Sequence, residues 1–211
     1  MEPFHLRRGF TLIELMVVLA IIVTITTIAL MNQSSFNKTL ILANTAYDIA
    51  LTLRSAQSFG IGSRATTLGT ANAGYGLHFQ TGTPGSFILF ADTNLPNASN
   101  CHGLPFSGNI SAPDAQPGNC IYDSGADTLT QTYVLGNGIT VSNLCAYSSS
   151  WYCALSSLDI VFARPNPDAF INAGGFSYTA ACLTITSPQG GLRSVSVAAS
   201  GAITVSASPC S

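Results

Sequence analysis

Residues 7–31, RRGFTLIELMVVLAIIVTITTIALM, decide how this chain is organised. From Phe10 to Met31 the segment holds 22 residues and only one charged side chain, Glu14. A helix needs about 20 consecutive apolar residues to cross a bilayer. The sequence therefore predicts one membrane-spanning helix near the N-terminus.

The residues on either side of this segment predict its orientation. Arg7 and Arg8 directly precede it, whereas Lys38 is the only cation that follows closely. The positive-inside rule then places the N-terminus in the cytoplasm and residues 32–211 outside it. The stretch after Met31, NQSSFNK, lacks the A-x-A-like site at which a secretory signal is removed, so we expect the helix to remain as an anchor.

Residues 7–15, RRGFTLIEL, resemble the prepilin signature shared by type IV pilins and type II secretion pseudopilins. The resemblance implies that a prepilin peptidase removes residues 1–9 as a leader by cutting after Gly9, and then methylates the new amine of Phe10. It also implies a subunit that leaves the inner membrane to join other pilin or pseudopilin subunits, through its N-terminal helix, in a periplasmic or extracellular filament.

Glu14 makes membrane insertion of this helix less favourable, because a carboxylate at the centre of a membrane helix costs about 2.5–3.5 kcal/mol of insertion free energy. After cleavage it would lie four residues, or about 6 Å along the axis, from the amine of Phe10. Its partner is then that amine or, as the resemblance implies, the amine of a neighbouring subunit during assembly. The alternative is a glutamate hydrated at the membrane surface with no role in assembly.

The chain after the membrane segment continues as an amphipathic helix. Leu42, Ala46, Ile49, Leu53 and Ala56 recur at spacings of three and four residues, which predicts one buried helical face. We expect a single helix over 10–59, ended by the glycines at 60 and 62 and locally unwound at NQSSFNK. Its transmembrane half is 10–31 and its amphipathic half is 32–62.

Residues 63–211 carry the signals of a β-rich globular domain. Short β-prone runs bounded by Gly and Pro predict strands at 75–79, 87–91, 131–135, 139–143, 158–163, 182–186, 192–198 and 202–207. The last three should form a meander. The Asn-, Pro-, Gly- and Ser-rich stretch 92–127 should be a long loop. The predicted fold class is α+β.

Two further stretches resemble the GspH/FimT-type minor subunits of these systems. LTLRSAQSFGIGSR (51–64) resembles the end of their helix, and LTITSPQGGLRSVSVAASGAITV (183–205) resembles their closing strands. The resemblance implies a type IV pilin-like fold, in which a long N-terminal helix packs on a C-terminal antiparallel β-sheet domain. It implies a minor pilin or pseudopilin of a type IV pilus or a type II secretion pseudopilus.

The cysteines indicate disulfide bonds formed in an oxidising compartment, because their number is even and all lie beyond the membrane segment. No C-x-x-C pair supports the competing zinc site. Six cysteines allow 15 connectivities. Closure of short loops favours the pairs Cys101–Cys120, Cys145–Cys153 and Cys182–Cys210.

Catalysis has little support in the sequence. Beyond the leader, which holds His5, the only imidazoles are those of His78 and His102, and no catalytic or nucleotide-binding motif accompanies them. We expect His78 to face solvent and His102 to neighbour a disulfide-bonded Cys101 rather than to form a Cys–His dyad. Asp123 to Asp127 could offer oxygens to calcium, but a solvated turn is the better interpretation. We therefore expect no cofactor, no metal and no enzyme.

A DNA receptor or an adhesive tip subunit is the alternative function, since some FimT-type pilins take up DNA through a G-R-x-R motif. This chain has Gly191-Leu-Arg193 and no later cation. Residues 32–211 contain seven acidic groups and five cations, namely Lys38, Arg54, Arg64, Arg164 and Arg193. Because phosphate binding needs clustered cations, the charge argues against nucleic acid. The loop 92–127 stays open as a surface for some other extracellular ligand.

Overall fold

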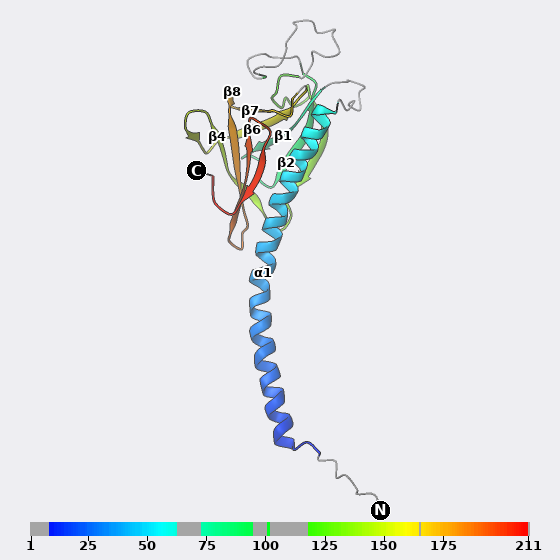
Figure 1. Cartoon of the computed structure of the whole chain (residues 1–211), viewed down its shortest axis with the longest axis vertical. Helices are drawn as coiled ribbons and strands as arrows, with labels where there is room; N and C mark the ends of the chain where they lie inside the picture. The colour runs from blue at the N-terminus through cyan, green and yellow to red at the C-terminus, as the bar shows by residue number, and fades with distance from the viewer. Residues whose placement is uncertain (1–8, 63–72, 95–100, 102–117, 165, 211) are drawn as a thin grey trace, which may run out of the picture. The chain divides into compact units, whose positions relative to one another are not determined.

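The computed structural model describes residues 9–62, 73–94, 101, 118–164 and 166–210 (Figure 1). The chain divides into two compact units, Met1–Leu40 and Ile41–Ser211. One helix, α1 (Leu12–Ile61), contributes residues to both units, and all the strands belong to the second. The N-terminal apolar helix is therefore followed by a β-rich unit, as an α+β chain requires.

Helix α1 differs from the expected helix in three details. It begins at Leu12 and ends at Ile61, two residues later at each end than expected. The polar stretch 32–38 lies within the helix, so the expected unwinding is wrong. Gly60 does not stop the helix either. A Cβ there would lie 2.1 Å from the backbone oxygen of Phe162, so this glycine lets α1 approach a strand closely.

The second unit contains two antiparallel sheets. Sheet A has the order β3-β2-β1-β6-β7-β8, and sheet B has the order β11-β10-β9-β4-β5. The strands are β1 (Gly74–Gln80), β2 (Ser86–Asp92), β3 (Thr128–Val134), β4 (Thr140–Tyr147), β5 (Trp151–Tyr152), β6 (Ser157–Phe162), β7 (Ala169–Ala173), β8 (Phe176–Tyr178), β9 (Ala180–Thr186), β10 (Leu192–Ala198) and β11 (Ile203–Ser206). The predicted meander of the last three strands is confirmed by their antiparallel pairing.

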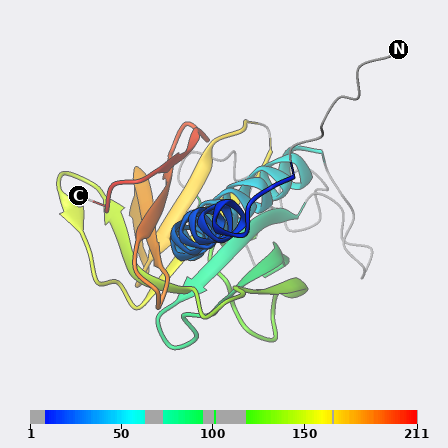
Figure 2. The ribbon, with the colours of Figure 1, turned by 90° about the horizontal axis from the view of Figure 1, so that it is seen from below.

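One hydrophobic core joins both sheets to the second half of α1. All five residues of the predicted helical stripe are buried, so that prediction is confirmed. They pack with inward residues of sheet A, such as Leu77 and Ile160, and of sheet B, such as Leu183 and Val195. Figure 2 looks along the helix and shows strands of both sheets around it.

The opposite face of sheet A is covered as well. A second cluster contains Phe90, Val161 and the buried disulfide Cys101–Cys120. The described residues 118–122 lie over this face and bring Tyr122 against Phe90, with ring centroids 5.1 Å apart. The central strands β1 and β6 of sheet A are therefore buried on both faces, which decides the surroundings of the polar residues considered below.

Candidate functional site

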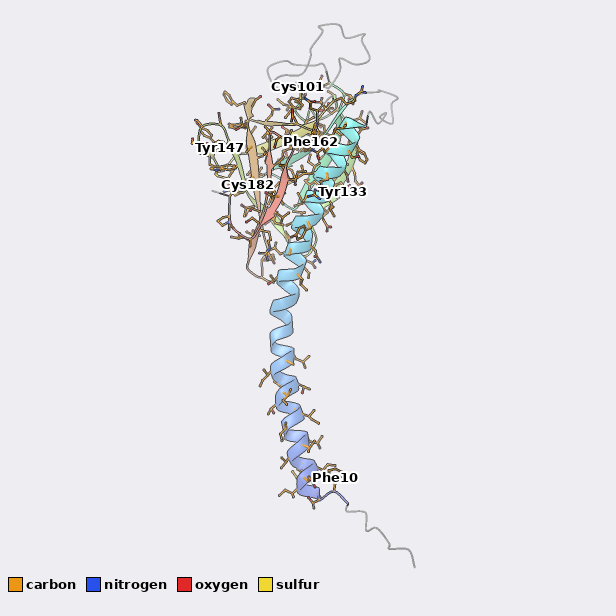
Figure 3. All side chains as sticks on the ribbon, in the orientation of Figure 1. Phe10, Cys101, Tyr133, Tyr147, Phe162 and Cys182 are labelled. Atoms are coloured by element: carbon orange, nitrogen blue, oxygen red, sulfur yellow. A yellow bond between two sulfur atoms is a disulfide. The ribbon has the colours of Figure 1, made fainter. Side chains whose placement is uncertain are left out.

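The expected processing and assembly residues lie at the start of α1. Gly9 and Phe10 precede the helix and are exposed, Phe10 by 82% (Figure 3). Glu14 stands in the first helical turn. Both residues on either side of the Gly9–Phe10 bond are therefore accessible.

Thr11 caps the helix, a role that the sequence interpretation missed. Its Oγ1 accepts a hydrogen bond from the backbone N–H of Glu14 at 3.3 Å, and its carbonyl oxygen accepts the N–H of Leu15 at 3.2 Å. Thr11 and Glu14 thus have the spacing of a capping box, S/T-x-x-E, in which threonine satisfies a free backbone donor at the helix start. That four-residue pattern was a readable signal.

The apolar part of α1 is exposed over the residues that the structure describes. Leu12–Leu30 forms a 19-residue candidate membrane span with a mean hydropathy of 2.6, and none of it is buried. Its side chains point outward on all sides in Figure 3. The threonines add little polarity, because Thr24, Thr26 and Thr27 bond back to carbonyl oxygens one turn earlier. Such a surface needs lipid or other apolar helices around it.

The six cysteines form three disulfides, each closing a local loop. The pairs are Cys101–Cys120, Cys145–Cys153 and Cys182–Cys210, and no cysteine is free. They are the pairs that loop closure favours, and all lie in the β-rich unit. The first pair excludes a thiol at Cys101, while His102 lies outside the described residues.

Asp92 holds the segment that covers sheet A. Its side chain is fully buried at the end of β2 and accepts backbone N–H groups from Asn119 and Cys120. From β7, the Asn172 amide donates to the carbonyl oxygen of Cys120 at 2.9 Å. Burial, reinforced by the negative charge of Asp127, raises the pKa of Asp92 well above its usual range. We call these contacts the polar clasp.

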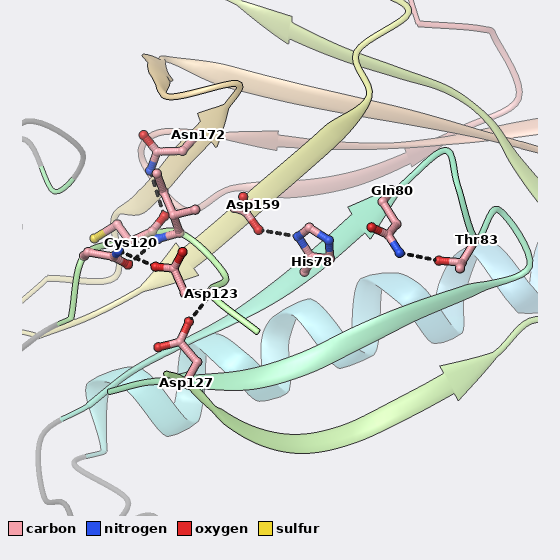
Figure 4. A network of polar contacts seen from close by, with 10 residues as sticks. His78, Gln80, Thr83, Cys120, Asp123, Asp127, Asp159 and Asn172 are labelled. Carbon is pink, nitrogen blue, oxygen red and sulfur yellow. Dashed lines mark hydrogen bonds and ion pairs between the residues drawn. The ribbon is translucent and has the colours of Figure 1, made fainter. Parts of the chain in front are cut away.

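His78 is buried, so its predicted exposure to solvent is wrong. The alternation of β1 does turn it away from the main core, but the covering segment lies on that face. Its Nδ1 is 2.6 Å from Oδ1 of Asp159, directly opposite on β6, and its ring lies 4.7 Å from that of Tyr122 (Figure 4). Burial raises the pKa of Asp159, and the bond to His78 offsets part of that rise.

The pair His78–Asp159 lies inside the β-rich unit. Both side chains are enclosed, with 10% and 5% of their side-chain surfaces exposed. The described neighbours of the imidazole are the Asp159 carboxylate and the Tyr122 ring. The pair joins two strands and supports the covering segment.

The turn from Asp123 to Asp127 is exposed to solvent at residues 124–126, as expected, and its two ends are tied to the fold. Asp127 accepts the backbone N–H groups of Thr93, Asn94 and Asp123. Asp123 Oδ2 accepts the amides of Asn94 and Asn119 at 2.8 and 2.6 Å. Partial burial raises the pKa of Asp127. Over the described residues, no cluster of three or more His, Cys, Asp or Glu could hold a metal ion.

Arg54 and Arg193 lie on different elements, α1 and β10. Arg193 is half-buried on β10 and donates to the neighbouring carbonyl oxygen of Leu192 at 2.9 Å. Arg54 is exposed on α1. The side chains of Lys38 and Arg64, like residues 95–100 and 102–117 of the expected loop, lie outside the described part of the chain.

Comparison with known proteins bears on the N-terminal segment. Residues 5–30 match the family model described as the Prokaryotic N-terminal methylation motif. The match includes Gly9, Phe10, Thr11 and Glu14 and indicates a type IV pilin-like precursor. No curated protein and no solved structure matches the chain. The pilin-type motif implies, in general, processing by a prepilin peptidase and assembly with other pilin subunits.

Proposed function

We propose that this chain is a structural subunit, a minor pilin or pseudopilin, of a type IV pilus or a type II secretion pseudopilus. The observation that carries the proposal is a methylation-motif segment that leads directly into a 19-residue apolar helix with no buried part. A peptidase substrate that keeps such a helix after cleavage can move from lipid to a bundle of like helices. That transfer is what filament assembly requires.

Processing would remove residues 1–9 and leave Phe10 as a methylated N-terminus. Cleavage at this bond places the new amine one residue before the cap at Thr11. A positive charge there opposes the helix dipole, whose N-terminal end is also positive. The amine therefore needs a carboxylate, and Glu14 is the acidic residue of the first turn.

Assembly through Glu14 follows from this charge arrangement. Each subunit presents one amine and one carboxylate in an apolar setting, and both are costly there without a partner. Pairing the amine of an incoming subunit with Glu14 of its neighbour neutralises both charges. It also fixes the axial register of the two helices.

The location that we propose is the inner membrane, with a cytoplasmic N-terminus and an extracytoplasmic β-rich unit, followed by the filament. Three disulfides in that unit fit an oxidising compartment. We divide the precursor into a leader (1–9), a transmembrane half (10–31), an amphipathic half (32–62) and a globular domain (63–211).

The GspH/FimT subtype is the finer part of the proposal, supported by the closing strands β9–β11. Gly201, in the last turn, has a φ of 79°, and a Cβ there would lie 2.1 Å from the carbonyl oxygen of Pro167. The amide of Gln57 on α1 donates to the carbonyl oxygens of both Pro167 and Gly201. This glycine therefore lets the final hairpin close against the helix.

Processing is tested by co-expressing the full chain with a prepilin peptidase and measuring the mass of its N-terminal peptide. We expect a peptide that begins with N-methylated Phe10, and an intact leader in Gly9→Val. An intact Met1 leader on the unaltered chain, in cells where the peptidase cleaves another substrate, would overturn the proposal.

Assembly is tested separately with Glu14→Ala and Glu14→Gln in cells that build the filament. Glutamine keeps the size of the side chain and removes its charge, so we expect both variants to be cleaved but to lose filaments or filament-dependent export. Normal assembly of both variants would contradict the role of Glu14 while leaving the processing result intact.

A further inference from the structure

Two cysteines from different disulfides face each other on sheet B. Cys145 on β4 and Cys182 on β9, the latter labelled in Figure 3, are directly opposite in the antiparallel pairing of these strands. Their neighbours Leu144 and Leu183 belong to the hydrophobic core, so both cysteines point to the outer face of the sheet. Opposite residues have Cα atoms about 4.5 or 5.5 Å apart, which is within the range of about 4.4–6.8 Å that a disulfide spans. Cys145 and Cys182 are therefore placed to bond to each other as well.

Each of these two cysteines is bonded to a partner that lies nearer the surface. Cys145 is fully buried, whereas its partner Cys153 is exposed. Cys182 is buried, whereas its partner Cys210 is half-buried. A thiol from the solvent therefore has its most accessible point of attack at Cys153.

Cys210 belongs to a C-terminal tail, residues 207–210, that crosses the same face of sheet B. The hydroxyl of Ser194 on β10 donates to the carbonyl oxygen of Ser208 at 2.7 Å. The backbone N–H of Cys210 donates to Oγ1 of Thr184 on β9 at 3.4 Å. The tail thus runs from β11 over β10 to β9, where the bond to Cys182 fastens its end.

Thr184 is placed to assist the departure of the Cys210 sulfur. Its hydroxyl donates to Sγ of Cys210 at 3.2 Å. A hydrogen bond to sulfur stabilises the thiolate relative to the thiol, and a more stable thiolate is the better leaving group in disulfide exchange. The bond between Cys182 and Cys210 is thus prepared to break with the electron pair on Cys210.

We propose that the four cysteines of this face form a thiol–disulfide exchange site, which takes up a small external thiol at Cys153 and produces a free thiol at Cys210. The site uses no residue of the N-terminal segment, so the inference goes beyond the proposed function and does not depend on it. It requires the oxidised fold and a small thiol such as glutathione.

Two successive exchanges carry the reaction, and each one conserves the number of disulfides. The external thiol first loses its proton to water. Its thiolate then attacks Sγ of Cys153, forms a mixed disulfide there and expels Cys145 as a thiolate. The Cys145 thiolate attacks Sγ of Cys182 on the opposite strand, and Cys210 leaves as a thiolate that takes a proton from water. The tail then keeps its hydrogen bonds to β9 and β10 but loses its covalent bond.

The test uses the full oxidised chain in detergent micelles, with reduced glutathione as the thiol. After timed incubation, free thiols are blocked with N-ethylmaleimide, and chymotryptic peptides are mapped by mass spectrometry without reduction. We expect glutathione on Cys153 and maleimide on Cys210, together with a linked Cys145–Cys182 peptide. Maleimide on Cys145 beside an intact Cys182–Cys210 bond would overturn the proposal, and so would the absence of glutathione from Cys153.

The variant Cys153→Ser tests the second exchange without any external thiol. It leaves Cys145 without its partner, so we expect the Cys145–Cys182 bond and maleimide on Cys210. An unpaired Cys145 with the bond from Cys182 to Cys210 intact would contradict the proposal. The matched control is Cys120→Ser, which frees a cysteine at the disulfide on sheet A. The bond between Cys182 and Cys210 should stay intact in that variant.

Thr184→Val separates assistance to the leaving group from a general loosening of sheet B. We expect it to slow the appearance of the Cys210 thiol by about threefold or more, because the departing thiolate loses its hydrogen-bond donor. Thr184→Ser keeps the hydroxyl and should keep the rate. Uptake of glutathione at Cys153, the first exchange, should be equal in all three proteins. An unchanged rate at Cys210 in the valine variant would overturn the role of Thr184.

Discussion

The hydroxyl of Thr11 accepts a hydrogen bond from the backbone N–H of Glu14 at 3.3 Å, and this bond closes the first turn of α1. The residue expected to receive a subunit's amine is therefore also the third residue of a capped helix. Because the cap fixes that turn, it also limits where the Glu14 carboxylate can lie.

Removing the cap should loosen this turn without removing the charge. We expect Thr11→Ala to cost about 1 kcal/mol of helix stability at the N-terminus, and Thr11→Ser, which keeps the hydroxyl, to cost little. Amide hydrogen exchange of the cleaved protein in detergent micelles measures this. Protection of the first-turn amide of Glu14 should fall in the alanine variant only. Equal protection in both variants would show that the hydroxyl is not the cap.

The polar clasp should be sensitive to a methyl group at Gly118. Gly118 has a φ of 83°, and a Cβ there would lie 1.9 Å from the Asp92 carboxylate. Gly125 is a matched control, with a φ of 91° and no atom within 4 Å of the corresponding position. We expect Gly118→Ala to lower the free energy of unfolding by at least about 2 kcal/mol more than Gly125→Ala, since the buried hydrogen bonds of Asp92 are displaced. Urea unfolding in detergent measures the difference, and equal losses would contradict the clasp.

The raised pKa of Asp92 predicts how stability depends on pH. A carboxyl whose folded-state pKa lies above its unfolded value of about 3.9 stabilises the fold fully below that value. The contribution is lost as pH rises through the folded-state pKa. We therefore expect the free energy of unfolding, relative to that of Asp92→Asn, to fall as the pH rises above about 4. Asp168→Asn, at an exposed position, provides the control. A relative stability that rises with pH would show that folding lowers the pKa of Asp92 instead of raising it.

The disulfides should contribute differently to the free energy of unfolding, according to the length of the loop that each one closes. Cys182–Cys210 spans 28 residues and Cys145–Cys153 spans 8. The loop-entropy estimate gives about 3.5 kcal/mol for the longer loop and about 2.5 kcal/mol for the shorter one. We expect the double alanine variant that lacks Cys182–Cys210 to have a lower urea midpoint than the one that lacks Cys145–Cys153. The opposite order would show that packing around the sulfur atoms outweighs chain entropy.

Local patterns predicted much of this fold. Apolar periodicity identified the helix and its buried stripe, and eight of the strands lie at predicted runs. Three strands were missed: β5, β7 and β8. The hairpin β7–β8 had a readable signal, because Gly174 and Gly175 form a two-residue turn with φ of 56° and 82° between apolar runs.

The surroundings of His78 could not be predicted in the same way. Alternation along β1 indicates toward which face of the sheet His78 points, but not which residues cover that face. The answer depends on Cys120 and Tyr122, more than forty positions later in the sequence. The same holds for the division of the strands into two sheets, which is decided by long-range pairing. At the N-terminus, by contrast, the relevant residues are adjacent, so the sequence carries the whole candidate site.

None of the three disulfides includes a residue of α1. The second half of the helix is held to the sheets by its buried stripe, by the close approach at Gly60 and by the hydrogen bonds of Gln57. If the chain assembles as proposed, pulling on the filament would load each subunit through the helix and the β-rich unit. The load then falls in shear on non-covalent packing, so the crosslinked sheets would survive intact while the helix slid out. The breaking force of a subunit is set by that core rather than by its sulfur bonds.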